Sequence, residues 1–123
     1  MDNFDKLISH SDHDLEFGNI KIKVFNGVFT PDQNITNSSS IILNNFPDME
    51  NKNVLDIGAG TGIIAIHSKI VGAKEVTATD ISDKALENAR ENARNLSVNI
   101  NFVKSDLFEN LNNSYDFIFA NLP

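Results

Sequence analysis

The feature that most constrains this chain is an apolar run that ends in three alternating glycines. The run is Val54–Ile57, and Gly58, Gly60 and Gly62 follow it. Glycine lets the backbone turn sharply and lets a ligand approach the main chain closely. Apolar residues then recur at helical spacing until Gly72 supplies a stop, which predicts a strand, a tight turn and a helix in succession. The recurring residues are Ile63, Ile64, Ile66 and Ile70.

The same alternation of strand and helix continues along the chain. Val76–Thr79, Ile100–Val103 and Tyr115–Ala120 predict three more strands, and Ser82 is placed to cap a helix between the first two of them. Such alternation is typical of α/β proteins, in which a parallel sheet with flanking helices binds ligands at the carboxyl ends of its strands. The second helix has one apolar stripe, made by Ala85, Leu86, Ala89, Ala93 and Leu96.

The residues before this repeat predict a short β-hairpin. Ile20–Val24 alternate apolar residues with Lys, and Asn26-Gly27, a favoured two-residue turn, leads into Val28–Thr30. Pro31 should end the second strand, because proline cannot donate to a strand ladder. Residues 1–16 are acidic and show no clear period, so we expect a loosely held arm or a short surface helix there.

A further helix is expected to begin in the polar cluster Thr36–Ser39 and to bury Phe46. The predicted organisation is therefore an N-terminal arm and hairpin over residues 1–35, followed by a ligand-binding α/β domain over residues 36–123.

Charge and cysteine content narrow the function. Ten Lys and Arg against seventeen Asp and Glu give a net charge of −7, which disfavours a free-standing binder of phosphate backbones. The sequence has no Cys, which excludes disulfides and thiolate metal sites. His10 and His13 lie near Asp12 and Asp14, but an acidic, unpatterned terminus is usually solvated, so no metal site is predicted. No signal peptide and no membrane helix is recognisable, so we expect a cytoplasmic protein without a membrane partner.

The glycine turn is open to more than one interpretation. A plain tight turn would seldom need three glycines. The fingerprint of a nicotinamide or flavin dinucleotide site, G-x-G-x-x-G, needs its third glycine at position 63, which is Ile. In addition, Asp56 places a carboxylate beside the turn, where a diphosphate would be repelled.

The segment Val54–Ile66 resembles the first motif of the class I S-adenosylmethionine-dependent methyltransferases, of the type with a methyltransferase small domain. The resemblance implies a Rossmann-like sheet and S-adenosyl-L-methionine as the cofactor. In that family the glycine turn packs against the methionine moiety and the ribose, while the acidic residue before it helps to hold the charged amino acid end. The residues implied by this are Asp56, Gly58, Ala59, Gly60 and Gly62.

Carboxylates after the next two strands fit the same reading. Asp80 ends the second strand, 22 residues after Gly58, and an acceptor-only carboxylate there can take both hydroxyls of a ribose, as it can in dinucleotide folds. By resemblance, Ile81 lies against the adenine, Asp106 accepts a hydrogen bond from the adenine amino group, and the backbone N–H of Leu107 reaches a ring nitrogen.

The last three residues, Asn121-Leu122-Pro123, resemble the [N/D/S]-P-P-[Y/F] motif of methyltransferases that act on planar amino nitrogens. The lone pair of such a nitrogen is conjugated and must be freed. The Asn121 side-chain carbonyl and a backbone carbonyl beside Pro123 could accept both N–H protons, which favours the pyramidal nitrogen that attacks a methyl group. The implied acceptor is an RNA base or a protein glutamine. The second position of the motif is Leu122 instead of proline, a form seen in some RNA dimethyladenosine enzymes, which favours an RNA base. The net charge of the chain favours a protein acceptor.

The segment around Phe29 and Thr30 resembles the loop that shapes the substrate mouth in small-domain methyltransferases. The resemblance spans Gly18 to Pro123, and the family fold continues through three more strands in the order 3-2-1-4-5-7-6. We therefore expect a partial core whose fourth strand is an open edge that associates with itself or with a partner subunit. Two alternatives stay open: a non-catalytic cofactor-binding or partner subunit, and a nicotinamide-dependent oxidoreductase.

Overall fold

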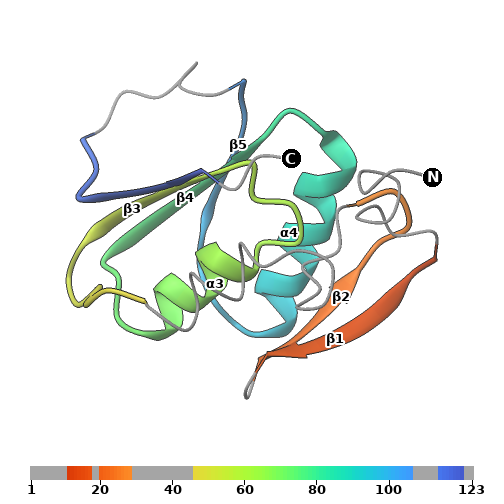
Figure 1. The fold of residues 1–123 in the computed structure, drawn as a ribbon, viewed down its shortest axis with the longest axis horizontal. Helices are drawn as coiled ribbons and strands as arrows, with labels where there is room; N and C mark the ends of the chain where they lie inside the picture. The colour runs from red at the N-terminus through yellow and green to blue at the C-terminus, as the bar shows by residue number, and fades with distance from the viewer. Residues whose placement is uncertain (1–10, 18–19, 29–45, 107–113, 121–123) are drawn as a thin grey trace.

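The computed structural model describes residues 11–17, 20–28, 46–106 and 114–120. These residues form a four-stranded parallel sheet, two helices packed on it, and a separate two-stranded antiparallel sheet (Figure 1). The α/β fold class and the parallel sheet predicted from the sequence are confirmed.

The parallel sheet consists of β3 (Asn53–Ile57), β4 (Glu75–Asp80), β5 (Asn101–Lys104) and β6 (Phe117–Ala120). Their order in the sheet is β5-β4-β3-β6, which is the predicted order 3-2-1-4. The strand ends differ from the predicted ones by one or two residues, as is usual at element boundaries.

A side chain fixes the register of β6 against β3. The Asp116 carboxylate Oδ2 accepts a hydrogen bond from the Asn53 N–H at 2.8 Å, and the Asp116 N–H donates to the Asn53 carbonyl oxygen at 2.8 Å. With that start, Leu55 lies opposite Ile118 and Ile57 lies opposite Ala120. The carboxyl ends of β3 and β6 therefore meet at one edge of the sheet.

The two helices begin as the sequence predicts. Helix α3 (Ile63–Ile70) starts at Gly62, whose φ of 86° is left-handed. Helix α4 (Asp83–Asn95) starts at Ser82, whose hydroxyl accepts a hydrogen bond from the Ala85 N–H at 3.1 Å. This bond satisfies one of the free N–H groups of the first turn, and Asp83 in that turn complements the helix dipole.

The core lies between the helices and the sheet. The four residues predicted for the α4 stripe that lie within the helix are buried, and Leu96, at its end, packs partly buried against the core. Because most residues of this stripe are alanines, α4 can approach its neighbours closely. The core cluster of apolar residues in α3, β3 and β4 comprises Ile63, Ile64, Ala65, Ile66, Val54, Val76 and Ala78.

The antiparallel sheet corrects the predicted hairpin. Its strands are β1 (His13–Phe17) and β2 (Ile20–Val24), so the partner of β2 precedes it, in a segment predicted to be a loosely held arm. The two strands match because Leu15 lies opposite Ile22 and Phe17 opposite Ile20.

The predicted turn at Asn26-Gly27 does form, with a 3.1 Å hydrogen bond from the Val28 N–H to the Phe25 carbonyl oxygen. It follows the end of β2, however, and Val28 lies in a bend, not in a strand. The rest of the predicted second strand, Phe29 and Thr30, and the predicted helix before Phe46 lie outside the described residues.

The fourth strand is an edge strand within the described residues, as predicted, but it exposes less apolar surface than an open edge could. Phe117 and Phe119 are half-buried against the core, and the Phe119 ring stacks on Phe46 with centroids 5.4 Å apart. Ile118, which lies between them, is 51% exposed. In the described ranges, no helix is long and apolar enough to cross a membrane.

Candidate functional site

The glycine turn lies across the end of β4. The N–H groups of Gly58 and Ala59 both donate to the Thr79 carbonyl oxygen, each at 2.9 Å, and the Gly62 N–H closes the turn on the Ala59 carbonyl oxygen at 2.9 Å. Gly58, Gly60 and Gly62 all have positive φ values, which other residues adopt only under strain. Three glycines are thus required by the path of the backbone itself.

Two of these glycines also differ in what surrounds them. A Cβ atom at Gly60 would meet nothing within 4 Å, so the main chain there borders open space. A Cβ atom at Gly62 would lie 2.9 Å from the Ala89 Cβ. Gly60 therefore leaves room for a ligand, whereas Gly62 lets the start of α3 pack against α4.

Asp80 connects the end of β4 to the middle of the glycine turn. Its carboxylate accepts a hydrogen bond from the Gly60 N–H at 3.1 Å through Oδ2, and one from the Ser82 N–H at 3.0 Å through Oδ1. Each carboxylate oxygen has a further lone pair for a ligand. The next residue, Ile81, is 63% exposed, so an apolar surface lies directly beside this acid.

Asp56 is a buried carboxyl group with acceptors to spare. It is 1% exposed, and within the described structure neither of its oxygens has a hydrogen-bond partner of ordinary geometry. The pKa of Asp56 is raised to about 7, chiefly by burial; the backbone N–H of Ala65, in the first turn of α3, offsets part of this rise, and the charge of Asp80 adds to it. A buried carboxyl group of this kind is expected to gain from a cationic partner.

The end of β5 joins the same edge. The Ser105 N–H donates to the Asp80 carbonyl oxygen at 3.2 Å, and Asp106, the next residue, is exposed. The structure thus brings together most of the predicted cofactor residues: Asp56, Gly58, Ala59, Gly60, Gly62, Asp80, Ile81 and Asp106.

The other predicted site residues lie outside the described residues. They are Phe29, Thr30, Leu107, Asn121, Leu122 and Pro123, and their roles stay predictions. Because Ala120 lies opposite Ile57, the chain leaves β6 at the edge where the glycine turn begins.

Sequence reasoning missed two polar residues next to this site. Asn88 and Asn92, on α4, are 0% and 1% exposed, and the Asn92 Nδ2 donates to the Thr61 carbonyl oxygen in the glycine turn at 2.9 Å. The sequence does indicate that they are buried, because Asn88 and Asn92 are four residues apart and lie on the helix face that carries the alanine stripe. Amides on an apolar face indicate buried hydrogen bonds.

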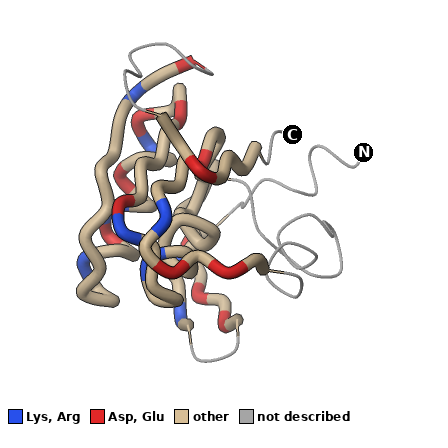
Figure 2. The backbone as a smooth tube through the Cα atoms, turned by 90° about the vertical axis from the view of Figure 1, so that its left-hand side faces the viewer, with Lys and Arg blue, Asp and Glu red and all other residues tan. Residues whose placement is uncertain are grey.

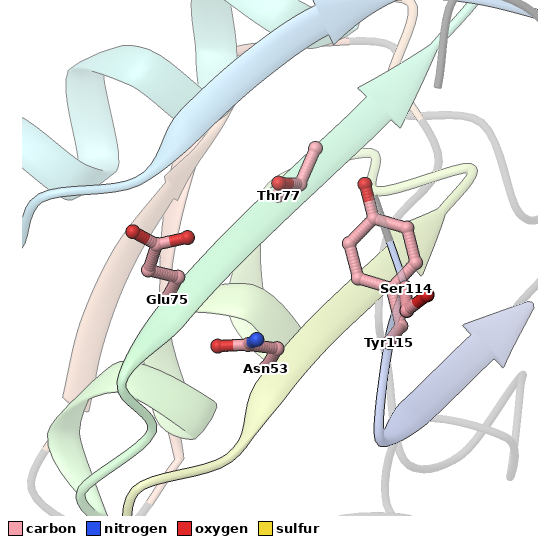
Figure 3. A pocket seen from close by; sticks show the side chains of 5 residues that line it. All are labelled: Asn53, Glu75, Thr77, Ser114 and Tyr115. Carbon is pink, nitrogen blue, oxygen red and sulfur yellow. The ribbon is translucent and has the colours of Figure 1, made fainter. Parts of the chain in front are cut away.

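A hollow of about 290 Å³ lies at the end of the sheet opposite the glycine turn (Figure 3). Asn53 and Glu75 are the first residues of β3 and β4, so this hollow borders the amino ends of the strands. None of the predicted cofactor residues lines it. Its lining residues are Asn53, Glu75, Thr77, Ser114 and Tyr115.

Comparison with known proteins decides the family. The family model described as "Methyltransferase small domain" matches residues 19–123. This chain belongs to that family. The membership confirms the family resemblance seen at Val54–Ile66.

Similar proteins support the same assignment. A protein of Methanocaldococcus jannaschii, provisionally named a protein N5-glutamine methyltransferase, is 41% identical over 109 residues, which are 89% of this chain and 53% of that protein. The crystal structure of the ribosomal protein L11 methylase of Lactobacillus delbrueckii subsp. bulgaricus is 33% identical, with a TM-score of 0.65 over 77% of this chain and 49% of that one. A SAM-dependent methyltransferase of Aquifex aeolicus is 31% identical, with a TM-score of 0.55 over 66% and 46% of the two chains. The chain thus spans about half the length of these relatives.

Proposed function

We propose that this chain is the S-adenosylmethionine-binding core of an N-methyltransferase whose acceptor is the side-chain amide of a protein glutamine. The observation that carries the proposal is the bond between the Asp80 carboxylate and the Gly60 N–H. It places an acceptor-only group and an open glycine turn side by side at the carboxyl edge of the sheet, where α/β proteins bind nucleosides.

The residues at this edge fit the parts of the proposed cofactor. The Asp80 carboxylate has lone pairs for the ribose hydroxyls, and Ile81 offers an exposed apolar side chain to a flat base. Among the described residues, neither Asp56 oxygen has a hydrogen-bond partner of ordinary geometry, which suits a cationic amino acid end. When bound, the cofactor would supply a methyl group activated by a positive sulfur. The chain itself would contribute orientation, since transfer to a positioned nitrogen needs alignment more than acid or base chemistry.

Two observations favour a protein acceptor over an RNA base. The name of the Methanocaldococcus jannaschii relative specifies a protein glutamine. The net charge of −7, with Lys and Arg interspersed among Asp and Glu along the described backbone (Figure 2), does not suit a polyanion. For the amide nitrogen, we assign Asn121 and the backbone beside Pro123 as the acceptors of its two N–H protons, with Leu122 between them.

The proposal is tested by the fate of a labelled methyl group. The chain is incubated with methyl-labelled S-adenosylmethionine and separate protein and RNA fractions of a cell extract. We expect label in material that protease, but not ribonuclease, renders soluble. Label in ribonuclease-sensitive material would move the acceptor to RNA. Binding of S-adenosylhomocysteine without transfer to either fraction would favour a non-catalytic subunit, and tighter binding of NADH would overturn the cofactor assignment.

The edge of β6 is our proposed site for self-association or a partner subunit. Within the described residues, β6 pairs with β3 on one side and has no strand on the other, and Ile118 is exposed there. Unpaired strand edges are templates for association. The expected cytoplasmic location stays a prediction.

A further inference from the structure

The two buried asparagines of α4 act on a part of the chain far away in the sequence. β1 covers one edge of β2, and the backbone of Lys23 in β2 turns its polar groups to α4. The Lys23 N–H donates to the Asn92 Oδ1 at 2.7 Å, and the Lys23 carbonyl oxygen accepts from the Nδ2 atoms of Asn92 and Asn88 at 2.8 and 2.7 Å. The Phe25 N–H, just beyond β2, donates to the Asn88 Oδ1 at 2.8 Å. Two side-chain amides thus take the place of a neighbouring strand.

Asn92 makes one bond that Asn88 does not. Its Nδ2 also donates to the Thr61 carbonyl oxygen at 2.9 Å, so its two amide hydrogens serve the hairpin and the glycine turn at once. The Thr61 carbonyl belongs to the peptide that leads into Gly62, where α3 begins. The bond therefore sets the plane of that peptide.

The glycine turn is consequently held from two sides. Asp80 holds the Gly60 N–H from the end of β4, and Asn92 holds the Thr61 carbonyl from α4. The Asp80 contact belongs to the site already described. The Asn92 side chain, which is fully buried, connects the turn to the backbone of β2, outside that site.

We propose that Asn92 is a positioning residue that joins the glycine turn and the β1–β2 hairpin into one cooperative unit. Loosening of the hairpin at Lys23 would then loosen the Thr61–Gly62 peptide, and a nucleoside bound at the turn would strengthen the docking of the hairpin. The second statement rests on the proposed function, while the first does not. Such coupling is reciprocal, because each event changes the free energy of the other by the same amount.

Amide hydrogen exchange of the ligand-free chain tests the first statement. In wild type, the N–H groups of Lys23 and Gly62 should open with the same free energy and the same dependence on denaturant, because they belong to one unit. Clearly different opening free energies would overturn the proposal. This measurement needs no variant, so it decides even if substitutions at this buried position prevent folding.

Matched Asn→Asp variants then locate the link. In Asn92→Asp, an oxygen replaces Nδ2 and faces the carbonyl oxygens of Lys23 and Thr61, so exchange at Lys23 and Gly62 should rise at least tenfold. Asn88→Asp should accelerate Phe25 and Lys23, which Asn88 contacts, and Gly62 by less than Asn92→Asp does, because Asn88 makes no bond to the turn. Asn95→Asp, the same substitution at an exposed position of α4, should change none of the three. Gly62 exchange in Asn92→Asp no faster than in Asn95→Asp would exclude the role of Asn92.

Titration with S-adenosylhomocysteine tests the second statement. The ligand should slow exchange at Lys23 in wild type, and Asn92→Asp should bind it at least tenfold more weakly than Asn88→Asp does. Equal affinities would contradict the coupling. If wild type binds no S-adenosylhomocysteine, the proposed function fails, while the ligand-free exchange data still decide the role of Asn92.

Discussion

A carboxyl group that is buried without a hydrogen-bond partner, as Asp56 is in the described structure, keeps its proton more readily in the folded chain than in the unfolded one. The pKa of Asp56 rises from 3.8 to about 7 on folding. Below pH 3.8 both states are protonated and the group has no effect. As the pH rises from there to about 7, the unfolded chain binds fewer protons than the folded one, so the stability contribution of Asp56 falls and then levels off.

Asp56→Asn removes this titration. We expect the variant to gain stability over wild type as the pH rises from 4 to 8, by up to about 4 kcal/mol for a shift of about three units. Urea unfolding of both chains at several pH values isolates the effect as their difference, which cancels the other titrating groups. A difference that does not change with pH would show that Asp56 titrates normally. The same variant should bind S-adenosylhomocysteine more weakly, since a neutral amide cannot form an ion pair with a cationic group.

Asp80 tests the ribose assignment at the same scale. Each charge-assisted hydrogen bond to a carboxylate contributes about 1.5–3 kcal/mol, so Asp80→Ala should weaken S-adenosylhomocysteine binding at least tenfold by calorimetry. Asp83→Ala is the matched control, because Asp83 lies three residues further on and pairs with Lys104 at the surface. The control should bind within twofold of wild type. If Asp80→Ala does the same, the assignment is wrong.

At the scale of elements, the glycine turn is where strand, helix and site meet. Gly62→Ala combines a φ of 86° with a Cβ 2.9 Å from the Ala89 Cβ, whereas Gly60→Ala meets open space. A left-handed residue costs about 1–2 kcal/mol in either variant, and overpacking adds about 1–3 kcal/mol to Gly62→Ala alone. Urea unfolding should therefore rank Gly62→Ala as the less stable.

Gly60→Ala, the more stable of the two variants, should nevertheless bind the ligand poorly. Gly60→Ala places a methyl group where the turn borders open space, so its loss of S-adenosylhomocysteine affinity should exceed what its small loss of stability explains. Full affinity in Gly60→Ala would mean that the ligand does not approach the turn at this residue.

The elements also show how far sequence reasoning reaches. The strands and helices from Val54 to Ala120 were predictable because apolar period, glycine position and the Ser82 cap all agree. The hairpin partner was not, because Asn26-Gly27 is a strong turn signal, while the choice of residues 13–17 depends on side chains matched across two strands. The apolar face of α4 indicates that Asn88 and Asn92 are buried, but their hydrogen-bond partners lie 31 to 69 residues away, so no local pattern identifies those partners.

For the whole molecule, the order of strands was implied by the family resemblance, whereas the alternation of strands and helices predicted a site at the carboxyl edge. The residues that complete the site around that edge could be predicted only in part. The sequence assigns Phe29 and Asn121 to the site by resemblance, and both lie outside the described residues.

The open edge of β6 gives a prediction at this scale. We expect the chain to associate as its concentration rises, and Ile118→Lys to shift it to monomer in sedimentation experiments, because charge at a strand edge opposes pairing. Ile70→Lys is the control, since Ile70 is 49% exposed on α3 and Ile118 51% exposed on β6. A wild-type chain that stays monomeric, or two variants that behave alike, would remove β6 as the interface.

The close approach of Gly62 to Ala89 means that the size of the residue at one position limits the size tolerated at the other. A larger residue at either one forces α3 and α4 apart and moves the turn between them. In an alignment of relatives, the two positions should therefore covary: both should carry small side chains, or a change at one should be accompanied by a compensating change at the other.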